Sequence, residues 1–344
     1  MKPMGRRSRE ILAATMIVKN EEAVLARCLT SLQGIVDEIH VHDTGSTDAT
    51  PDIAAEFGAV VTHGPWTGDF AAARNAALEG CTADWALVVD ADDQVVADAA
   101  ALREVLANTG AGVLQAEVHN IREYASESAF LSGRVFRPRW AMWKGKVHEQ
   151  LVGRTKSLRV ESVPSHVLHV RHSGYLSTTD ARARSERNVG IAQAQLDELV
   201  AQGPAADPVL LARTILDLGR SQVGAGRRQD AVDAFETVRE LFPGTPEWVR
   251  ATDFLARQVL VADMPDVCLV LSDQLRAAGT PAMYCDWLAA QALARLGETE
   301  TARQLLAGVT EVVDTTGLRH EPAALRELKE LVDALATTAR PLFA

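Results

Sequence analysis

Three carboxylates lie within four positions, at Asp90, Asp92 and Asp93, directly after the apolar run of residues 85–89. Such a run is typical of a strand that is buried on both faces of a parallel sheet. Carboxylates at the carboxyl end of such a strand lie where open α/β sheets bind ligands. Like charges this close repel one another unless a cation or hydrogen bonds offset the repulsion. Mg²⁺ or Mn²⁺, which often also binds substrate phosphates, is a suitable cation for such carboxylates. The residues alone leave a second interpretation open, an acidic turn that caps the next helix.

Alternating strand and helix patterns surround this motif in the N-terminal half. Strands are predicted at residues 11–18, 36–42, 59–62 and 85–89, and helices at 21–34, after 48 with Pro51 in the first turn, and at 70–80. This order predicts an α/β domain with a parallel, doubly wound sheet and right-handed crossovers. The strand ends then share one edge, so residues 19–21, 43–45 and 90–93 should converge on one crevice.

Asp43 and Arg74 are the next candidates for chemistry in that crevice. Asp43 ends a predicted strand and could hydrogen-bond a nucleobase or ribose, or it could cap the helix that follows. Arg74 could hold a diphosphate through its rigid fork of donors, or it could form a salt bridge with Asp69 or another nearby acid. Several such groups at the strand ends of one crevice predict a nucleotide and metal site.

Taken in order, these motifs resemble a family 2 glycosyltransferase with the nucleotide-diphosphosugar transferase (GT-A) fold. The resemblance covers about residues 11–175. The segments that carry it are Met-Ile-Val-Lys-Asn-Glu-Glu (16–22), Val-Asp-Glu-Ile (36–39), Asp-Thr-Gly-Ser-Thr-Asp (43–48), Trp66, Asp-Phe-Ala-Ala-Ala-Arg-Asn (69–75) and Asp-Ala-Asp-Asp (90–93). Asp93 occupies a position where many relatives have Glu, which is compatible with a metal site.

The resemblance implies a function and a set of site residues. It implies transfer from a UDP-sugar, such as UDP-glucose or UDP-GlcNAc, with Mn²⁺ or Mg²⁺ as cofactor. The implied metal ligands are Asp92, with Asp90 in support, and His148. The implied nucleotide-sugar contacts are Val18, Asn20, Glu21, Asp43, Arg74, Asp90, Ala91 and Trp143.

Residues 113–175 predict a second, smaller set of strands that covers the acceptor side of the crevice. Within them, the segments 132–137 and 140–149 resemble parts of the same family branch. Trp140 and Trp143 could stack on a sugar or base, although tryptophans near a sheet edge more often serve packing.

Glu149 is the candidate general base, because an inverting transfer needs a carboxylate or imidazole near the acceptor nucleophile. The alternative is that Glu149 orients His148 or Arg137. His148, His169 and His172 are alternative candidates for a third metal ligand.

From about residue 179 onward strand patterns are replaced by helical segments with internal repetition. Gly226 precedes Ala231 and Phe235 with the same spacing with which Gly297 precedes Ala302 and Leu306. The two glycines are about twice 34 residues apart, and 34 residues is the period of tetratricopeptide repeats. Cys268 lies between the two sets. The sequence predicts an all-α, tetratricopeptide-like array that binds an acceptor, mediates dimerisation, or only buttresses the chain.

Composition narrows the range of functions. The chain has 344 residues with a formal net charge of −11, which argues against nucleic acid and anionic membranes as partners. No apolar segment is long enough for a transmembrane helix, so stable membrane insertion is not expected. Four widely spaced cysteines, Cys28, Cys81, Cys268 and Cys285, fit reduced thiols in a cytoplasmic protein.

The sequence therefore predicts two domains. Residues 1–178 should form a GT-A catalytic domain and residues 179–344 a helical repeat domain. The predicted reaction is an inverting, metal-dependent sugar transfer to a peptide, natural-product or glycan acceptor, and a homodimer is compatible with the repeats. A nucleotidyltransferase would need a glycine-rich phosphate loop, which residues 19–22 do not provide. A catalytically inactive scaffold that binds a partner remains the other alternative.

Overall fold

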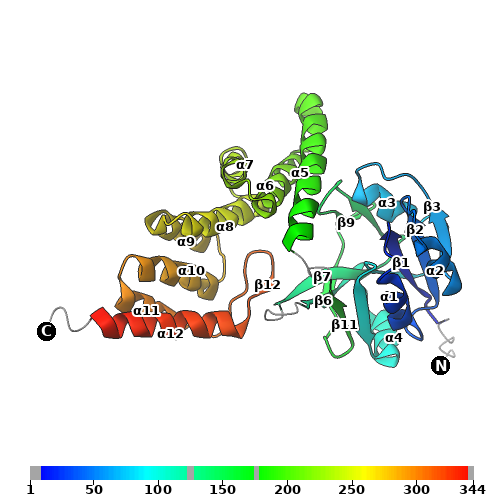
Figure 1. Ribbon diagram of the computed structural model, residues 1–344, viewed down its shortest axis with the longest axis horizontal. Coiled ribbons are helices and arrows are strands. Elements are labelled where there is room, and N and C mark those ends of the chain that lie inside the picture. Colours follow the sequence, from blue (N-terminus) through cyan, green and yellow to red (C-terminus); the bar gives the residue numbers. More distant parts are fainter. Residues whose placement is uncertain (1–8, 122–127, 174–177, 340–344) are drawn as a thin grey trace, which may run out of the picture. The chain divides into compact units, whose positions relative to one another are not determined.

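The computed structural model describes residues 9–121, 128–173 and 178–339, and Figure 1 shows their secondary structure. Two compact units are present, residues 1–123 with 130–176, and residues 177–344 with 124–129. Within the three described ranges, no helix combines the length and the apolar character that crossing a membrane requires.

The first half of the first unit is a parallel sheet. It contains β1 (Leu12–Val18), β2 (Glu38–Asp43), β3 (Val60–His63) and β4 (Trp85–Val88) in the order β3-β2-β1-β4. Because β1 pairs in parallel with both β2 and β4, the chain changes direction across the sheet at β1. The carboxyl ends of these strands therefore open a crevice of the kind in which open α/β sheets bind ligands. This half confirms the prediction of a doubly wound parallel sheet.

Beyond β4 the sheet is mixed, in contrast to the purely parallel expectation. The order continues β4-β7-β6-β11-β5, formed by β5 (Asp93–Ala97), β6 (Val113–Asn120), β7 (Ser128–Phe136) and β11 (Leu168–His172), with β10 (Val160–Ser162) beside β6. Strand β7 is antiparallel to β4, and β5 is antiparallel to β11. The strands predicted after residue 113 therefore extend the same sheet, because β7 pairs with the edge of β4. Strands β8 (Ala141–Lys144) and β9 (Gln150–Gly153) form a separate antiparallel hairpin.

The interpretation of residues 90–93 as a helix-capping turn is wrong, because strand β5 begins at Asp93. The helix that follows, α4 (Ala99–Asn108), is capped by Asp98, which accepts hydrogen bonds from the amides of Ala100 and Ala101. The acidic residues are therefore available for other contacts.

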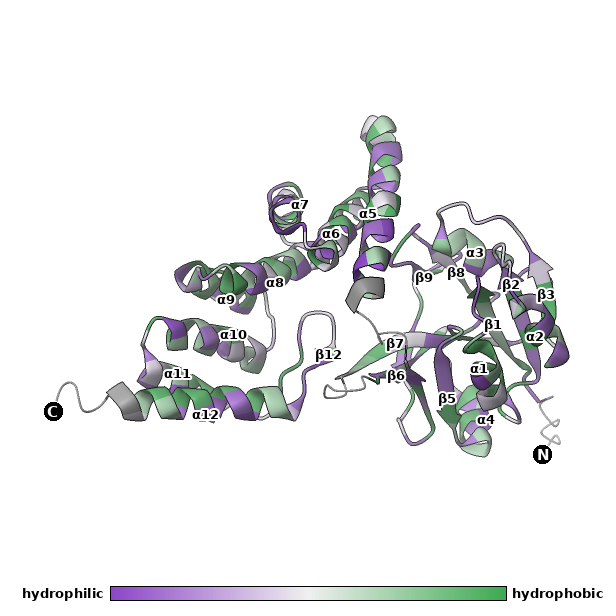
Figure 2. Cartoon of the chain, viewed as in Figure 1, coloured by the Kyte–Doolittle hydropathy of each residue, from purple (hydrophilic) through white to green (hydrophobic). Residues whose placement is uncertain are grey.

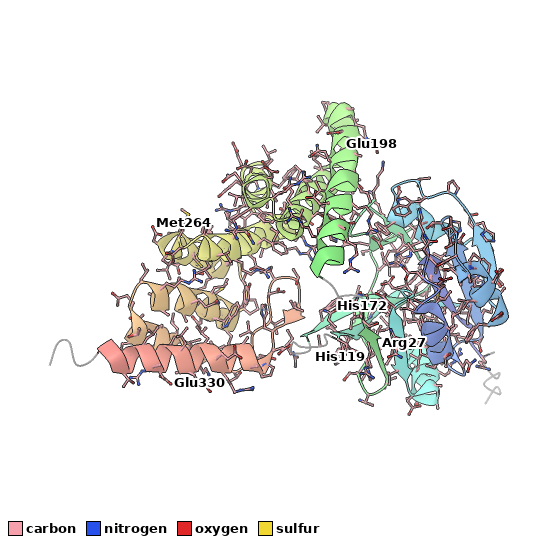
Figure 3. All side chains as sticks on the ribbon, in the orientation of Figure 1. Arg27, His119, His172, Glu198, Met264 and Glu330 are labelled. Carbon is pink, nitrogen blue, oxygen red and sulfur yellow. The ribbon has the colours of Figure 1, made fainter. Side chains whose placement is uncertain are left out.

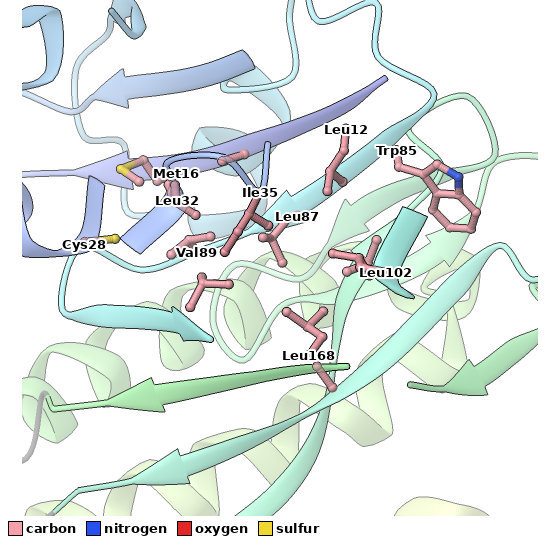
Figure 4. Packing of buried hydrophobic residues seen from close by; sticks show 14 of the residues in the cluster. Leu12, Met16, Cys28, Leu32, Ile35, Trp85, Leu87, Val89, Leu102 and Leu168 are labelled. Atoms are coloured by element: carbon pink, nitrogen blue, oxygen red, sulfur yellow. The ribbon is translucent and has the colours of Figure 1, made fainter. Parts of the chain in front are cut away.

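Helices cover both faces of the parallel half. Helices α1 (Leu25–Leu32), α2 (Thr50–Glu56) and α4 share one hydrophobic core with β1 and β4, and α3 (Phe70–Ala76) lies on the opposite face. Figure 4 shows this core, in which Leu12, Leu87 and Leu102 are completely buried. Burial of one such side chain contributes roughly 1.5–3 kcal/mol.

Helix α1 is shorter than the predicted segment of residues 21–34. The amides of Glu21 and Glu22 donate to the side chains of Thr50 and Asp48. Because side chains accept the hydrogen bonds of these two amides, the amides need no helical partner, and α1 begins only at Leu25.

The second unit is helical, with each helix packed against the next. Figure 2 shows apolar and polar residues alternating around these helices, as expected for amphipathic segments. They are α5 (Thr178–Ala201), the 3₁₀ turn η1 (Gly203–Ala205), α6 (Pro208–Ala225), α7 (Arg228–Leu241), α8 (Pro246–Val261), α9 (Pro265–Ala277), α10 (Ala282–Arg295), α11 (Thr299–Ala307) and α12 (Pro322–Ala339), with a short strand β12 (Leu318–Arg319).

The predicted repeat corresponds to equivalent positions in three helices. Ala231, Cys268 and Ala302 are each the fourth residue of α7, α9 and α11, and each is completely buried. Gly226 ends α6 in the left-handed conformation with φ 79°, which favours glycine. Small residues at these positions allow paired helices to approach closely. The successive packed helices confirm the predicted helix-turn-helix array.

Candidate functional site

The ends of β1 and β2 form the first side of the crevice. Val18 and Asp43 are partners in the parallel ladder, and both are buried. The Asp43 carboxylate accepts hydrogen bonds from the amides of Gly45 and Ser46 at 3.3 and 3.1 Å, and its Oδ2 lies 3.3 Å from Nδ1 of His63. Burial raises the pKa of Asp43, but these bonds outweigh burial and lower it overall. Asp43 therefore holds the turn after β2 and does not cap α2, whose N-cap is Ala49.

The loop after β1 lies against that turn. Asn20 adopts a left-handed backbone conformation with φ 56°. Its Oδ1 accepts from the amide of Thr47 at 2.8 Å, and its own amide donates to Oγ of Ser46 at 2.9 Å. Glu21 is fixed through its amide to Oγ1 of Thr50. The structure thus brings Val18, Asn20, Glu21 and Asp43 together, as predicted from the topology.

Arg74 connects the acidic strand to the candidate base. Its Nε donates to Oε1 of Glu149 at 2.5 Å, and a terminal nitrogen donates to Oδ1 of Asp90 at 2.8 Å. Burial lowers the pKa of Arg74, but Asp90 and Glu149 together raise it further above its ordinary value. The predicted salt bridge of Arg74 therefore forms with these two acids, whereas Asp69 caps α3 by accepting from the amide of Ala72.

The β8–β9 hairpin carries Glu149 to this position. Asn75, the neighbour of Arg74 on α3, holds the backbone of Trp143 with two hydrogen bonds of 3.0 Å. The amide of Phe70 donates to the carbonyl of Lys146 in the hairpin loop. Helix α3 therefore fixes both the strand and the loop of the hairpin, with Glu149 immediately before β9.

Trp143 is largely a packing residue in this structure. It is 8% exposed and lies edge-on to Phe136 at 5.7 Å. The guanidinium of Arg74 lies 5.3 Å from the centre of its ring, so Trp143 supports the arginine. Trp140 is 44% exposed, with the Arg137 guanidinium 4.9 Å from the centre of its ring.

Arg134 holds the other side of the acidic motif. This buried arginine on β7 reaches Oδ2 of Asp90 at 3.4 Å and Oδ2 of Asp93 at 3.0 Å. Asp93 is completely buried, accepts from the amide of Asp90 at 2.9 Å, and lies 2.8 Å from Nδ1 of His172. Asp93 and His172 meet because they are partners in the β5–β11 ladder.

These contacts form one continuous series of charges, which we call the ion chain. It runs Glu149, Arg74, Asp90, Arg134, Asp93, His172 and Asp92. Four carboxylates face two guanidinium groups, so with neutral histidine the chain carries an excess of two negative charges. A divalent cation is the simplest partner that neutralises this excess.

Asp92 is the carboxylate that this chain compensates least. Its Oδ1 lies 3.4 Å from Nδ1 of His172. Burial raises the pKa of Asp92, His172 opposes that rise, and the neighbouring Asp90 and Asp93 reinforce it, so that the pKa is raised overall. For Asp90, by contrast, Arg74 and Arg134 outweigh burial and lower the pKa. A cation near Asp92 would relieve the repulsion that this carboxylate experiences.

One group of donor atoms in the ion chain could hold a metal ion. Donor atoms of Asp90, Asp93 and His172 all lie within 4.8 Å of one another; carboxylate oxygens suit hard divalent ions, whereas imidazole suits transition metals. His172 lies at the end of β11 and is labelled with Arg27 in Figure 3. Arg27 donates to Oγ of Ser173, which donates to the carbonyl of Asp92, so α1 and the segment after β11 fix the backbone of the motif.

The remaining candidates lie in different surroundings. Ala91 is buried within the acidic motif. His148 has a left-handed backbone with φ 50° and is absent from the metal-competent groups found among the described residues. His169 hydrogen-bonds the carbonyl of Ser165 and its ring lies against His119, away from the ion chain. His148 as a metal ligand stays a prediction.

Arg134 and Asn75 are the contributors that the sequence did not identify individually. Both lie inside motif segments, yet their partners are distant in sequence, at 41 residues from Arg134 to Asp93 and 68 from Asn75 to Trp143. An arginine inside a predicted strand is the only signal available, because buried arginines require carboxylate partners.

Comparison with known proteins identifies the first unit. Residues 14–151 match the model of "Glycosyl transferase family 2". A TPR repeat-containing protein of Synechococcus elongatus is 51% identical over 84 residues, which cover 24% of this chain and 21% of that protein. The SPbeta prophage-derived glycosyltransferase SunS of Bacillus subtilis is 30% identical over 189 residues, 53% of this chain and 44% of SunS. The chain thus spans less than half the length of these curated relatives.

Among solved structures, TarS 1–349 of S. aureus covers 90% of this chain and 96% of its own, with 12% identity and a TM-score of 0.36. The assignment of the first unit rests on the sequence matches and on the observed sheet. Residues 14–151 match glycosyltransferase family 2, and in this chain that stretch is followed by a helical repeat region.

Proposed function

We propose that this chain is a metal-dependent, inverting glycosyltransferase whose donor is a UDP-sugar such as UDP-glucose or UDP-GlcNAc. The observation that carries the proposal is the ion chain, in which four carboxylates face two guanidinium groups beside the carboxyl ends of the strands. The family match supports a nucleotide-sugar donor. The choice of UDP as the nucleotide and the requirement for a metal ion are parts of the proposal.

The proposed donor site lies along the crevice. Val18, Asn20, Glu21 and Asp43 form its nucleoside end, where the Asp43 carboxylate is ionised and fixed by the turn after β2. The other proposed donor contacts are Arg74, Asp90, Ala91 and Trp143. A diphosphate that bonds to Arg74 would compete with Asp90 and Glu149 for its donors, because guanidinium binds phosphate with two parallel bonds.

The proposed ligands of Mn²⁺ or Mg²⁺ are Asp92 and Asp90, with His148 as the third predicted ligand. His172 is an alternative third ligand, supported by its position beside Asp90 and Asp93. When bound, the ion supplies Lewis-acid chemistry that offsets the charge of the leaving diphosphate. The residues themselves bind and orient the donor around it.

Glu149 is the proposed general base. Its carboxylate would take the proton of the acceptor hydroxyl, thiol or amine. The acceptor atom then forms a bond to the anomeric carbon while the bond from that carbon to the diphosphate oxygen breaks, and UDP leaves. The contact with Arg74 fixes the position of the Glu149 carboxylate.

The proposal also covers the organisation of the chain. Residues 1–178 would be the catalytic domain and residues 179–344 the repeat domain of a cytoplasmic enzyme. The acceptor would be a peptide, a natural product or a glycan, and the repeats offer a surface for a peptide acceptor or for homodimerisation.

A donor panel tests the proposal directly. The thermal midpoint of the full chain is measured with each of several UDP-, GDP- and dTDP-sugars, in Mn²⁺, Mg²⁺ or EDTA. A ligand that binds the folded state raises the midpoint, so one UDP-sugar should do so only with metal. Asp92→Ala should abolish the shift, and Glu161→Gln, which alters an acid on β10 that pairs with Arg159 and is not a member of the ion chain, should retain it. The absence of any shift with nucleotide sugars would favour the inactive scaffold.

A further inference from the structure

A second cluster of metal-ligating side chains lies outside the ion chain, on the face of β2 that α3 covers. It consists of Glu38, His40 and Cys81, whose donor atoms all lie within 4.8 Å of one another. Glu38 and His40 are two positions apart on β2, so their side chains lie on the same face of the strand. The third member comes from the segment that follows α3.

The backbone around Cys81 directs the thiol to this position. Gly80 has φ 77°, a left-handed conformation that favours glycine, and the amide of Cys81 donates to the carbonyl of Leu78. The chain therefore turns sharply after α3, and Cys81 contacts His40. His40 is 7% exposed, and its Nε2 lies 3.1 Å from Oε2 of Glu38.

We propose that Glu38, His40 and Cys81 form a binding site for Zn²⁺. A thiolate, an imidazole and a carboxylate are the three ligand types that this ion takes, in a tetrahedral arrangement. The carboxylate–imidazole distance of 3.1 Å is close to the edge of a coordination tetrahedron with bonds of about 2.0 Å. The ionised thiol and carboxylate together carry two negative charges, which the ion neutralises.

The fourth position of the tetrahedron would be open to water. The Glu38 side chain is 37% exposed, whereas that of His40 is 9% exposed, so the cluster is buried on one side and accessible on the other. A site with three protein ligands and an entry path from solvent meets the requirements for reversible binding.

The two metal sites of this unit differ in the ions they prefer. The ion chain offers mainly carboxylates, which favour the hard ions Mg²⁺ and Mn²⁺, whereas the thiolate of Cys81 selects borderline or soft ions. A Zn²⁺ ion at the second site would connect β2 to the segment that follows α3. Strand β2 ends at Asp43, and helix α3 carries Arg74. Its role would be structural, because no residue of the ion chain takes part.

Cobalt provides a spectroscopic test on the full chain with reduced thiols. Co²⁺ is titrated with Mg²⁺ in excess, which occupies the carboxylate site. Wild-type protein should develop a thiolate-to-cobalt charge-transfer band and the visible bands of a tetrahedral ion at one ion per chain, and Zn²⁺ should remove both. The absence of a thiolate band in the wild type would overturn the proposal.

Variants assign the band to the cluster. Cys81→Ser should abolish it and lower Zn²⁺ affinity at least about 100-fold, more than the loss of an outer-shell partner costs. Asp92→Asn should retain the band, because it alters only the carboxylate site. A band that persists in Cys81→Ser would contradict the assignment.

A milder variant keeps the test decisive if Cys81→Ser does not fold. Glu38→Gln removes one charged ligand from a partly exposed position and should keep the thiolate band while Zn²⁺ binds at least about 100-fold more weakly, again more than the loss of an outer-shell partner costs. Unchanged Zn²⁺ affinity in Glu38→Gln would overturn the three-ligand site.

Discussion

Arg74 holds two carboxylates at once, Asp90 of the acidic motif and Glu149, the candidate base. Its guanidinium holds Asp90 and Glu149 at 2.8 and 2.5 Å and lies over the ring of Trp143. These contacts require a planar group with donors on different edges, which lysine lacks. The residue therefore orders the acidic motif and the candidate base together.

Glu149→Gln is the sharpest residue-scale test of the base. Glutamine keeps an oxygen that can accept from Arg74 but cannot take a proton. We expect kcat to fall about 10²–10⁴-fold, the range for the loss of a general base, with donor affinity nearly unchanged. Transfer rates and UDP titrations of this variant check it, with Glu161→Gln as the matched control. Wild-type kcat in Glu149→Gln would remove this residue from the mechanism.

The raised pKa of Asp92 predicts how metal binding depends on pH. A proton competes with the cation for this carboxylate at a higher pH than it does for an ordinary aspartate. Mn²⁺ affinity should therefore fall as the pH decreases through the range just above 3.8, the ordinary pKa of aspartate, since ligands must lose their protons to bind. Calorimetric Mn²⁺ titrations at several pH values measure this, and an affinity that is constant over the range would disagree with the raised pKa.

At the scale of elements, β7 contributes the buried charge that stabilises the acidic motif. Arg134→Met would leave Asp93, which is completely buried, without its guanidinium partner. The expected loss is about 3–5 kcal/mol in the free energy of unfolding. Arg159, whose side chain is 71% exposed and pairs with Glu161, offers the control, since Arg159→Met should cost about 0–1 kcal/mol.

Urea unfolding of both variants compares these losses. The double variant Arg134→Met, Asp93→Asn should recover part of the stability, because it removes the unpaired charge. Equal losses for Arg134→Met and Arg159→Met would show that the ion chain has no special role in folding.

The contact between α6 and α7 depends on a glycine without a side chain. A Cβ at Gly219 would lie 2.6 Å from the ring of Phe235, whereas one at Gly190 in α5 would meet nothing within 4 Å. Gly219→Ala should therefore destabilise the repeat region by about 1–3 kcal/mol. Gly190→Ala should stabilise it by up to about 1 kcal/mol. Thermal midpoints that move in the same direction for both would contradict this packing.

Asp217 in α6 predicts a pH dependence of the repeat region. Burial raises the pKa of Asp217 to about 6, against the opposing effects of Arg220 and Arg213. The folded state then binds more protons than the unfolded state between the two pKa values, so this group makes stability fall as the pH rises through that window. The effect is at most about 3 kcal/mol.

The stability of wild type relative to Asp217→Asn should therefore decrease from about pH 4 to about pH 7. Asp273→Asn on the exposed side of α9 is the control and should show no such trend. A stability difference that does not change with pH would exclude a raised pKa for Asp217.

At the scale of the whole molecule, the sequence predicted the parallel half and the helical repeat. Both follow from local patterns, namely apolar runs that end in polar turns and small residues at fixed spacing. Strands were predicted within residues 113–175, but strand β5 and the pairing that makes this half mixed were not, because β7 pairs with β4 and β5 with β11 across segments far apart in the chain. Periodicity contains no information about such pairings.

The same limit applies to the site. The strand ends identified Asp43, Asp90 and Asp92, since their position follows from topology. The partners of Asp90 could not be read from the sequence, because Arg74 and Arg134 are 16 and 44 residues away. The fold had to bring four carboxylates and two guanidinium groups together before the excess of negative charge became visible.

The measurement that tests the central claim most directly is a calorimetric titration of UDP into the full chain, with Mn²⁺ and then with EDTA. We predict one nucleotide per chain with Mn²⁺, binding at least about 100-fold weaker in EDTA, and the same loss in Asp92→Ala with Mn²⁺ present. Equal UDP affinity in Mn²⁺ and EDTA, or an unaffected Asp92→Ala, would contradict a metal-dependent nucleotide site at the ion chain.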